Sequence, residues 1–372
     1  MKLTLPRETL APALAALSRV VERRNTIPIL SNILVTARDG RLTLRATDLD
    51  IQAETSLPCE VAEAGAVTLP AHTLSDIVRK LPAEAQITLE GIDKQTAMAL
   101  RSGRSRFTLQ TLPESDFPDL TIGEFEARFQ LPAASLARII DEVGFAISTE
   151  ETRYYLNGIY WHCRQVDGAN ILTAVATDGH RLSRVEMPAP PGASAMPGVI
   201  VPRKTVAELA RMAKDAEGDL AIELSPTKIR VTAGAATLTS KLIDGTFPDY
   251  QRVIPTGNDK LATIDRETFK NAVDRVSTIS SERGRAVKLA LSDAGLTLAV
   301  TNPDSGSATE ELEPDYDGAP IEIGFNARYL LDVLGILGGD TIIMKLAEPG
   351  APAVFQRTAG TDLLIVLMPM RV

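Results

Sequence analysis

Residues 129–143, with the sequence FQLPAASLARIIDEV, place a strand pattern directly before a helix pattern. Phe129 and Leu131 alternate with polar neighbours, as residues do in a half-buried strand. Pro132 marks the turn, since proline is tolerated at a helix start, where a backbone N–H would have no partner. The apolar residues after it have the i, i+3, i+4, i+7 spacing of one buried helix face: Leu136, Ile139, Ile140 and Val143. The stretch predicts a short strand that leads into an amphipathic helix.

The same combination of patterns occurs five more times along the chain. The first apolar residues of successive helices are separated by 64, 62, 70, 63 and 61 positions. Such nearly even intervals indicate an internal repeat. The other five apolar sets are Leu10, Ala13, Leu14 and Leu17; Leu74, Ile77, Val78 and Leu81; Val206, Leu209, Ala210 and Ala213; Phe269, Ala272, Val273 and Val276; and Leu330, Val333, Leu334 and Leu337.

The segments between the predicted helices alternate apolar and polar residues with a period of two, as in residues 41–45, 286–291 and 341–346. This alternation is typical of antiparallel strands that bury one face. Asp39-Gly40, between two such segments, favours a hairpin turn. Each repeat unit is therefore predicted to combine one helix with several antiparallel strands.

A longer period groups the six units into three pairs. Ala46-Thr47-Asp48 recurs 130 positions later as Ala176-Thr177-Asp178, and 124 positions after that as Val300-Thr301-Asn302. The predicted fold class is α+β, with three tandem similar domains that each hold two helices and antiparallel sheets. We expect the domains to span residues 1–125, 126–256 and 257–372. Equal units tend to stack with a constant rotation, which either closes into a ring or continues as a filament.

Positive charge is concentrated in the predicted helices, although the chain is acidic overall. The 372 residues include 39 Lys and Arg against 48 Asp and Glu, a formal net charge of −9. That balance argues against a generally basic nucleic-acid coat protein, because phosphate binding needs positive charge. The predicted helical segments 7–24 and 202–216, in contrast, each carry four basic side chains against two acidic ones. If the helices share one side, DNA would be attracted there through its phosphates, with little sequence information exchanged.

Several kinds of site are not indicated by the sequence. Cys59 and Cys163 lie far apart and the chain has only three histidines, which argues against a disulfide framework or a zinc site, so no metal or cofactor is expected. No G-x-x-x-x-G-K-[S/T] phosphate loop is present, which argues against ATP hydrolysis. Asp178, His180 and Ser183 fall within six residues, whereas catalytic triads are assembled from separated elements. We therefore expect no catalytic residues.

The sequence also gives no sign of membrane targeting. The first residues are interrupted by Pro6 and Pro12 and do not resemble a signal peptide. No run of about 18 apolar residues occurs, so no membrane span is expected. The expected location is the cytoplasm.

Six short stretches carry a resemblance to a known family. They are RNTIPIL at 24–30, RSGRSRF at 101–107, RYYLNG at 153–158, ATDGHRL at 176–182, FPDY at 247–250 and MPMRV at 368–372. In this order and over the whole chain, they resemble the beta subunits of bacterial DNA polymerase III, the DNA sliding clamps. The resemblance implies a non-catalytic processivity factor that encircles duplex DNA without reading its sequence and tethers the replicative polymerase.

The resemblance further implies a head-to-tail homodimer that closes into a ring, with helices inside and sheets outside. The subunit contact would join Phe107 and Leu109 of the first domain to Thr278 and Ile279 of the third. The implied partners are double-stranded DNA, the DNA polymerase III catalytic subunit, the clamp loader, and other polymerases and repair proteins that carry a clamp-binding peptide.

Carried over residue by residue, the family's hydrophobic pocket for such a peptide has fifteen members. Leu, Val and Met would line an adaptable apolar cleft, and Arg153 and Arg252 could hold a peptide carbonyl or carboxylate. The implied pocket residues are Arg153, Leu156, Thr177, Gly179, His180, Arg181, Leu182, Pro248, Arg252, Val253, Val366, Met368, Pro369, Met370 and Arg371.

A second set of residues is predicted to face DNA. Arg24 matches a family contact, and Tyr154 and Tyr155 match the family's loop tyrosines. The chain departs from the family pattern at Glu150-Glu151, where two acidic residues would weaken a phosphate contact. The full predicted set is Arg24, Arg79, Tyr154, Tyr155, Arg203 and Lys204.

Two other functions compete with a clamp. A nuclease would need clustered carboxylates for two metal ions, and the sequence has no obvious set. A peptide-binding scaffold without a DNA role would leave polymerase processivity unchanged when charge is reversed at Arg24, Arg203 and Lys204. A clamp would lose processivity under the same change.

Overall fold

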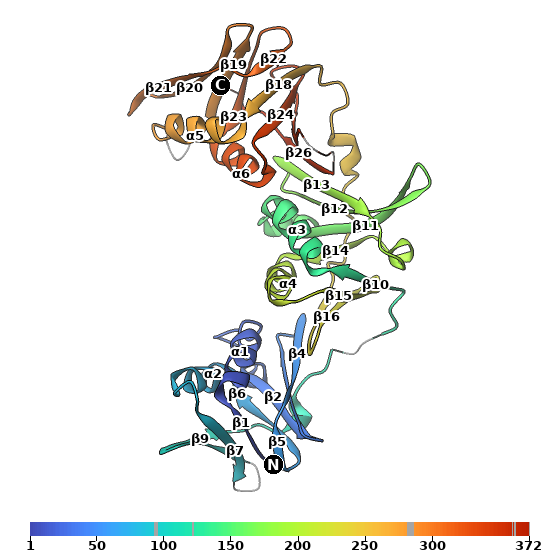
Figure 1. Ribbon diagram of the computed structural model, residues 1–372, viewed down its shortest axis with the longest axis vertical. Coiled ribbons are helices and arrows are strands. Elements are labelled where there is room, and N and C mark those ends of the chain that lie inside the picture. Colours follow the sequence, from blue (N-terminus) through green and yellow to red (C-terminus); the bar gives the residue numbers. More distant parts are fainter. Residues whose placement is uncertain (93–95, 121–122, 281–285, 359, 361, 372) are drawn as a thin grey trace. The chain divides into compact units, whose positions relative to one another are not determined.

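The computed structural model describes residues 1–92, 96–120, 123–280, 286–358, 360 and 362–371. Figure 1 follows the chain from its N-terminus to its C-terminus, and the contacts along it divide it into two compact units. The first combines Met1–Ala133 with Asp215–Lys241, and the second combines Ala134–Lys214 with Leu242–Val372. Each unit is therefore built from segments that are distant in the sequence.

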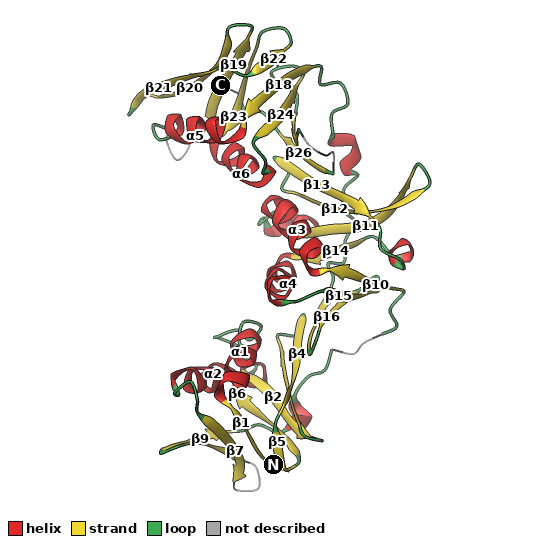
Figure 2. Ribbon diagram, in the orientation of Figure 1, coloured by secondary structure: helices red, strands yellow, loops and turns green. Residues whose placement is uncertain are grey.

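All six predicted helices are present, and each begins immediately after a strand (Figure 2). Their apolar stripes are largely buried, and all four stripe residues of the last helix are fully buried. The pairs of strand and helix are β1 Lys2–Pro6 and α1 Arg7–Leu17; β6 Gly65–Pro70 and α2 Ala71–Lys80; β10 Ala127–Pro132 and α3 Ala133–Val143; β14 Val199–Pro202 and α4 Arg203–Asp215; β18 Lys260–Asp265 and α5 Arg266–Ser277; and β23 Ile321–Asn326 and α6 Ala327–Leu337.

The helices begin by two different local mechanisms. The strands before α1 to α4 each end in proline, which stops the ladder and presets the backbone for a helix start. The last two helices instead have side-chain caps. Asp265 accepts a hydrogen bond from the Thr268 backbone N–H at 2.8 Å, and Asn326 accepts one from the Arg328 N–H at 3.0 Å.

Two antiparallel sheets form most of the first unit. One has the order β5-β1-β7-β8-β9 and the other the order β10-β15-β16-β17-β4-β3-β2-β6. The bounds not yet given are β2 Asn32–Arg38, β3 Arg41–Thr47, β4 Ile51–Pro58, β5 Glu60–Glu63, β7 Gln86–Ile92, β8 Ala97–Ser102, β9 Ser105–Gln110, β15 Asp219–Leu224, β16 Lys228–Ala233 and β17 Ala236–Lys241.

The second unit holds two further antiparallel sheets. Their orders are β14-β11-β12-β13-β26-β25-β24-β18-β22 and β21-β20-β19-β23. Their remaining bounds are β11 Gly158–Val166, β12 Ala169–Thr177, β13 Arg181–Pro188, β19 Ala286–Ser292, β20 Gly295–Asn302, β21 Gly306–Leu312, β22 Asp315–Asp317, β24 Thr341–Leu346, β25 Ala353–Arg357 and β26 Leu363–Leu367. The sheets continue across the sequence repeats, because β17 pairs with β4 and β13 pairs with β26.

The repeated Ala-Thr-Asp triplet forms the same hairpin turn in two places. Thr47 Oγ1 donates to the Ile51 carbonyl at 2.9 Å, and Thr177 Oγ1 donates to the Arg181 carbonyl at 2.7 Å. The next residue, Asp48 or Asp178, accepts backbone N–H groups of its own turn. These side-chain hydrogen bonds give the turn a defined shape, and the second copy lies at the site described below.

One predicted helix is shorter than expected. The basic segment 7–24 was counted as helical, but α1 ends at Leu17. Arg19, Arg23 and Arg24 therefore lie beyond it, and part of the predicted helical charge belongs to the following loop. After Leu17 the backbone tightens, because the Arg19 and Val20 N–H groups donate three residues back, to the Ala16 and Leu17 carbonyls at 3.3 and 3.1 Å, and the α-helix does not continue.

Candidate functional site

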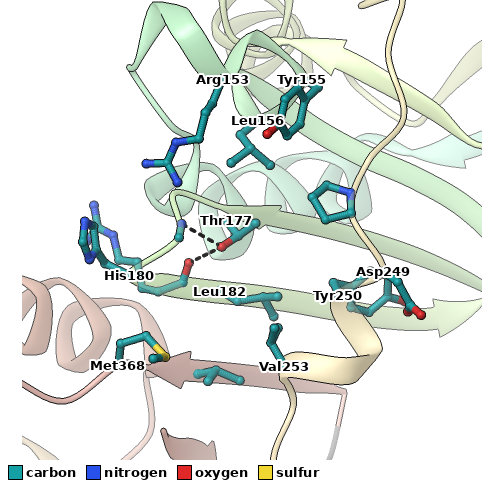
Figure 3. Close-up of a pocket in the computed structure, with 14 residues that line it drawn as sticks. Arg153, Tyr155, Leu156, Thr177, His180, Leu182, Asp249, Tyr250, Val253 and Met368 are labelled. Atoms are coloured by element: carbon teal, nitrogen blue, oxygen red, sulfur yellow. Dashed lines mark hydrogen bonds between the residues drawn. The ribbon is translucent and has the colours of Figure 1, made fainter.

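A cavity of about 330 Å³ lies in the second unit. It is bordered by two short 3₁₀ segments, η5 (Glu151–Leu156) and η7 (Tyr250–Val253), by the turn between β12 and β13, and by the end of β26 (Figure 3). The lining residues are Arg153, Tyr155, Leu156, Thr177, Gly179, His180, Arg181, Leu182, Pro248, Asp249, Tyr250, Val253, Val366 and Met368.

The floor of the cavity is apolar, and strand pairing holds it in place. β13 and β26 pair with Leu182 opposite Val366, and each residue is 2% exposed. Tyr250 packs into the same buried cluster. At the rim, Val253 and Met368 are 51% and 40% exposed. A buried apolar floor with exposed apolar residues at its edge is typical of a surface that contacts another molecule.

The rim also depends on a close approach between Arg153 and Gly179. Gly179 has φ +88°, a conformation that side-chain-bearing residues rarely adopt. A Cβ at this position would lie 2.6 Å from Arg153 Nη1. Arg153 Nη2 donates to the Asp178 carbonyl at 3.2 Å, so its guanidinium lies against the turn that carries Thr177 (Figure 3). The backbone conformation favours glycine here, and any Cβ would also force the flexible end of the Arg153 side chain to shift.

Arg181 is anchored within the protein. Its guanidinium donates to Asp178 Oδ2 at 3.1 Å and to Asp332 Oδ2, in α6, at 2.6 Å. It also lies 4.5 Å from the ring centroid of Tyr329 and 5.1 Å from that of Phe145. Its side chain is only 12% exposed. The contacts indicate that Arg181 ties the cavity turn to α6.

Two titratable groups are in contact at the cavity, the buried Tyr250 of its lining and the partly buried His162. His162 Nε2 is 3.0 Å from the Tyr250 hydroxyl. Burial lowers the pKa of His162, and the charge of Arg164 acts in the same direction. Burial also raises the pKa of Tyr250. Both shifts favour the neutral form of each group.

The residues that suggest a triad by composition have other partners. Ser183 Oγ donates to the Glu142 carbonyl at 2.6 Å and lies on the buried part of β13. Asp178 accepts from the backbone N–H of His180 at 2.9 Å. These side chains therefore hold the turn and strand in place. Within the described residues, no group of three His, Cys, Asp or Glu side chains could hold a metal ion.

Comparison with known proteins identifies the family over nearly the whole chain. Family models of the DNA polymerase III beta subunit match its N-terminal domain at residues 1–121, its central domain at 130–249 and its C-terminal domain at 251–371. The chain belongs to the DNA polymerase III beta subunit family. It is thus a sliding clamp of DNA replication, a non-catalytic processivity factor that tethers polymerases.

The alignments with individual relatives cover the full length of this chain and of each relative. The beta sliding clamp of Caulobacter vibrioides is 50% identical over 372 residues, and that of Escherichia coli K12 is 39% identical over 376 residues. The crystal structure of the Bartonella birtlesii clamp bound to griselimycin superposes with a TM-score of 0.96 at 51% identity, covering 100% of both chains. The clamp of Caulobacter crescentus also gives 0.96, at 50% identity and the same coverage. The three-domain clamp fold predicted from the sequence is thus confirmed.

Most residues predicted for the clamp's peptide pocket line the observed cavity, but four do not. Arg252 is 84% exposed and pairs with Asp249 at 2.8 Å. Met370 donates its backbone N–H to the Gly324 carbonyl at 2.7 Å, and Pro369 and Arg371 lie on either side of it, outside the lining.

The cavity also includes three residues that the prediction did not assign to it. Asp249 and Tyr250 directly follow Pro248, so the FPDY motif could have indicated them. Tyr155 was predicted to face DNA but lines the cavity. Tyr154 does not line the cavity, and its ring meets that of Tyr155 edge to face with an interplanar angle of 78°.

The other predicted DNA-facing residues lie at the surface. Tyr154, Arg203 and Lys204 line one shallow hollow at the start of α4. Arg24 is exposed, and Arg79 is exposed and pairs with Asp76 at 2.9 Å. The hollow brings an aromatic ring and two basic side chains to the same surface, which is suitable for a phosphate backbone.

The residues predicted for the subunit contact differ in exposure. Phe107 and Leu109 lie on β9, the edge strand of its sheet. Leu109 is only 6% exposed, whereas Phe107 is partly exposed. Thr278 and Ile279 follow α5, and the Ile279 carbonyl accepts a hydrogen bond from Asn302 Nδ2 at 2.9 Å.

Among the described helices, none is both long and apolar enough to cross a membrane.

Proposed function

We propose that the cavity between η5, the β12–β13 turn and β26 is the docking site for a short peptide of the polymerase and of other clamp partners. The partners would be the DNA polymerase III catalytic subunit, the clamp loader, and other polymerases and repair proteins. The observation that carries this proposal is the buried apolar floor with Val253 and Met368 exposed at its edge. A volume of about 330 Å³ accommodates a few apolar peptide side chains.

A peptide-binding experiment tests this site. Fluorescein-labelled peptides that cover the DNA polymerase III catalytic subunit of the same organism would be titrated with the full-length protein, and anisotropy would be recorded. Val253→Glu should weaken the best peptide at least tenfold, because it introduces a charge at an apolar contact. Leu261→Glu is the matched control, since Leu261 is 40% exposed and lies outside the cavity lining. Equal binding by the two variants would contradict the proposal.

We also propose that two copies of the chain form a closed ring. Two copies would meet head to tail, with Phe107 and Leu109 of one copy against Thr278 and Ile279 of the other, and the three domains of each copy would divide near residues 125 and 256. β9 and β21 are both edge strands, so each has one row of backbone groups without a strand partner among the described residues. Phe107→Asp should convert the dimer to a monomer in sedimentation experiments, whereas an unchanged dimer would exclude this contact.

Duplex DNA would pass through the ring and contact Arg24, Arg79, Arg203, Lys204 and the loop of Tyr154 and Tyr155. Sparse contacts to phosphate allow sliding because they carry no base information. The protein would be loaded on nicked circular DNA with ATP and a loader fraction. We expect retention on circles at high salt and loss from linearised DNA. Equal loss from both forms would show ordinary electrostatic binding and contradict encirclement.

Charge reversal tests the proposed DNA surface directly. Arg203→Glu with Lys204→Glu should lower polymerase processivity in a primer-extension assay. Arg38→Glu with Arg128→Glu, at exposed positions outside this hollow, supplies a comparison in which the net charge changes by the same amount without reversing this surface. Unchanged processivity in the Arg203 and Lys204 variant would favour a peptide-binding scaffold without a DNA role.

A further inference from the structure

Three arginines at or beside the cavity each pair with an acidic residue three positions earlier. Arg153 pairs with Glu150 at 2.7 Å, Arg181 with Asp178 at 3.1 Å, and Arg252 with Asp249 at 2.8 Å. The chain therefore supplies its own anionic partner to each of these cations. A docking peptide with an acidic group would compete with one of these partners for its arginine.

The three ion pairs differ in how readily the arginine could exchange its own carboxylate partner for a carboxylate of the peptide. Arg181 also binds Asp332, lies beside two aromatic rings and is 12% exposed, so it is fixed. Arg252 is 84% exposed and does not line the cavity. Arg153 lines the cavity and is 34% exposed, while its partner Glu150 is 53% exposed. Arg153 is therefore the lining cation whose carboxylate can move away into solvent.

Glu150 forms a two-point contact with Arg153. Arg153 Nε donates to Oε2 at 2.8 Å, and Nη2 lies 2.7 Å from Oε1. Such a bidentate pair occupies the Nε–Nη2 edge of the guanidinium, and its Nη1–Nη2 edge lies against the turn at Asp178 and Gly179. The hydrogen bond from Arg153 lowers the pKa of Glu150, and the nearby His180 acts in the same direction. Glu150 is thus held in its charged form beside Arg153.

The backbone keeps Glu150 in reach of Arg153. Glu150 precedes η5, and its N–H donates to Ser148 Oγ at 3.2 Å. Ser148 is 1% exposed and its own N–H donates to the Leu156 carbonyl at 3.1 Å. The loop is tied to a buried position while the Glu150 side chain remains at the surface. That arrangement permits the carboxylate to leave without unfolding the loop.

We propose that Glu150 is a built-in competitor that lowers the selectivity of the cavity for acidic peptides, because it occupies Arg153 until an acidic group of the docking peptide displaces it. The inference rests on the proposed peptide-binding function of the cavity. A peptide with a neutral residue at that place binds without disturbing the Arg153–Glu150 pair. An acidic peptide exchanges one exposed ion pair for another, so its own charge yields little net affinity. The clamp consequently discriminates little between acidic and neutral partner peptides.

Removal of the Glu150 carboxylate should increase the discrimination between acidic and neutral peptides. In Glu150→Gln the guanidinium loses its anionic partner, so an acidic peptide gains an ion pair without displacing another. We expect its affinity to rise roughly two- to fivefold, the range of an exposed pair, whereas a neutral peptide should change little. Glu151→Gln, which removes the same charge from the adjacent exposed residue, is the matched control.

The experiment uses the full-length clamp and the best polymerase peptide from the anisotropy titrations. The peptide is synthesised with Asp and with Asn at each position in turn, and each pair is titrated with wild type, Glu150→Gln, Glu151→Gln and Arg153→Gln. The expected result is one position at which Glu150→Gln selectively strengthens the Asp peptide. Glu151→Gln should not reproduce the effect, and Glu150→Gln combined with Arg153→Gln should remove it.

Other outcomes distinguish the inference about Glu150 from the proposed peptide-binding function of the cavity. The inference would be overturned if Glu150→Gln raised the affinity of Asp and Asn peptides equally at every position, or if Glu151→Gln gave the same gain. Either result would show that only the change in net charge matters. Peptide binding that is sensitive to Val253→Glu but indifferent to Glu150→Gln would also overturn it, while leaving the proposed function intact. Absence of any peptide that responds to Val253→Glu would remove the proposed function and the inference together.

Discussion

Arg181 should make a measurable contribution to the stability of the second unit, because its charge is nearly buried between several partners. We consider Arg181→Met, which keeps an unbranched side chain but removes the guanidinium. The change leaves Asp332 without its 2.6 Å partner and removes the contacts with the Tyr329 and Phe145 rings. Met should retain part of the packing against those rings.

The size of the effect follows from the burial of the pair. Breaking a fully buried ion pair costs about 3–5 kcal/mol, and an exposed pair contributes about 0–1 kcal/mol. Arg181 is 12% exposed and Asp332 is 39% exposed, so we take about 2 kcal/mol for the pair. The ring contacts add about 1 kcal/mol. For a unit of about two hundred residues, a loss of about 3 kcal/mol lowers the melting temperature by roughly 6–12 °C.

Calorimetry and urea unfolding of Arg181→Met, Asp332→Asn and the double variant would measure this effect. The double-mutant cycle isolates the contribution of the pair, since Asp178 remains present throughout. We expect a coupling energy of at least about 1 kcal/mol. Additive effects of the two substitutions, or a melting temperature of Arg181→Met within about 2 °C of wild type, would refute the assignment of Arg181 as the link between the cavity turn and α6.

Three further predictions follow from other parts of the site. Gly179→Ala should destabilise the protein by about 1 kcal/mol or more and weaken peptide binding, because φ is +88° and the new Cβ would meet Arg153; unchanged unfolding and binding would contradict this. The lowered pKa of His162 means that the unfolded chain takes up a proton before the folded protein does. Its contribution to stability is complete above the unfolded pKa near 6.5 and is lost as pH falls towards the folded pKa, so His162→Gln should flatten the acid side of a stability–pH curve measured by urea unfolding. Removal of residues 368–372, of which residue 372 lies outside the described residues, should abolish partner-peptide binding while sedimentation still shows a dimer; a monomeric or unfolded product would not support the pocket assignment.

The helices could be predicted from the sequence because their signals are local. Leu330, Val333, Leu334 and Leu337 lie within two helical turns, so their spacing alone defines the buried face of α6. The end of α1 was less predictable. Val20 and Val21 are buried although they lie beyond the helix, so apolar residues after Leu17 do not distinguish helix from packed loop.

The cavity required information that local patterns do not contain. Arg153 and Met368 both line it, although more than two hundred positions separate them in the chain. The family resemblance supplied most of the lining, yet it assigned Tyr155 to DNA and included Arg252. Which side of a loop a side chain faces depends on the packing of neighbouring segments, and Tyr155 packs partly buried against the cluster around Leu182 and Val366.

The sequence by itself determined the repeat, the six helices with the strands before them, and the Ala-Thr-Asp turns. Each of these depends on interactions among residues a few positions apart. Only the tertiary structure decided that β13 pairs with β26 and that β17 pairs with β4, because an edge strand can accept any compatible neighbour and the choice depends on long-range packing. The same packing joined the Thr177 turn to the end of β26 and thereby formed the cavity, with Glu150 and Arg153 paired at its edge.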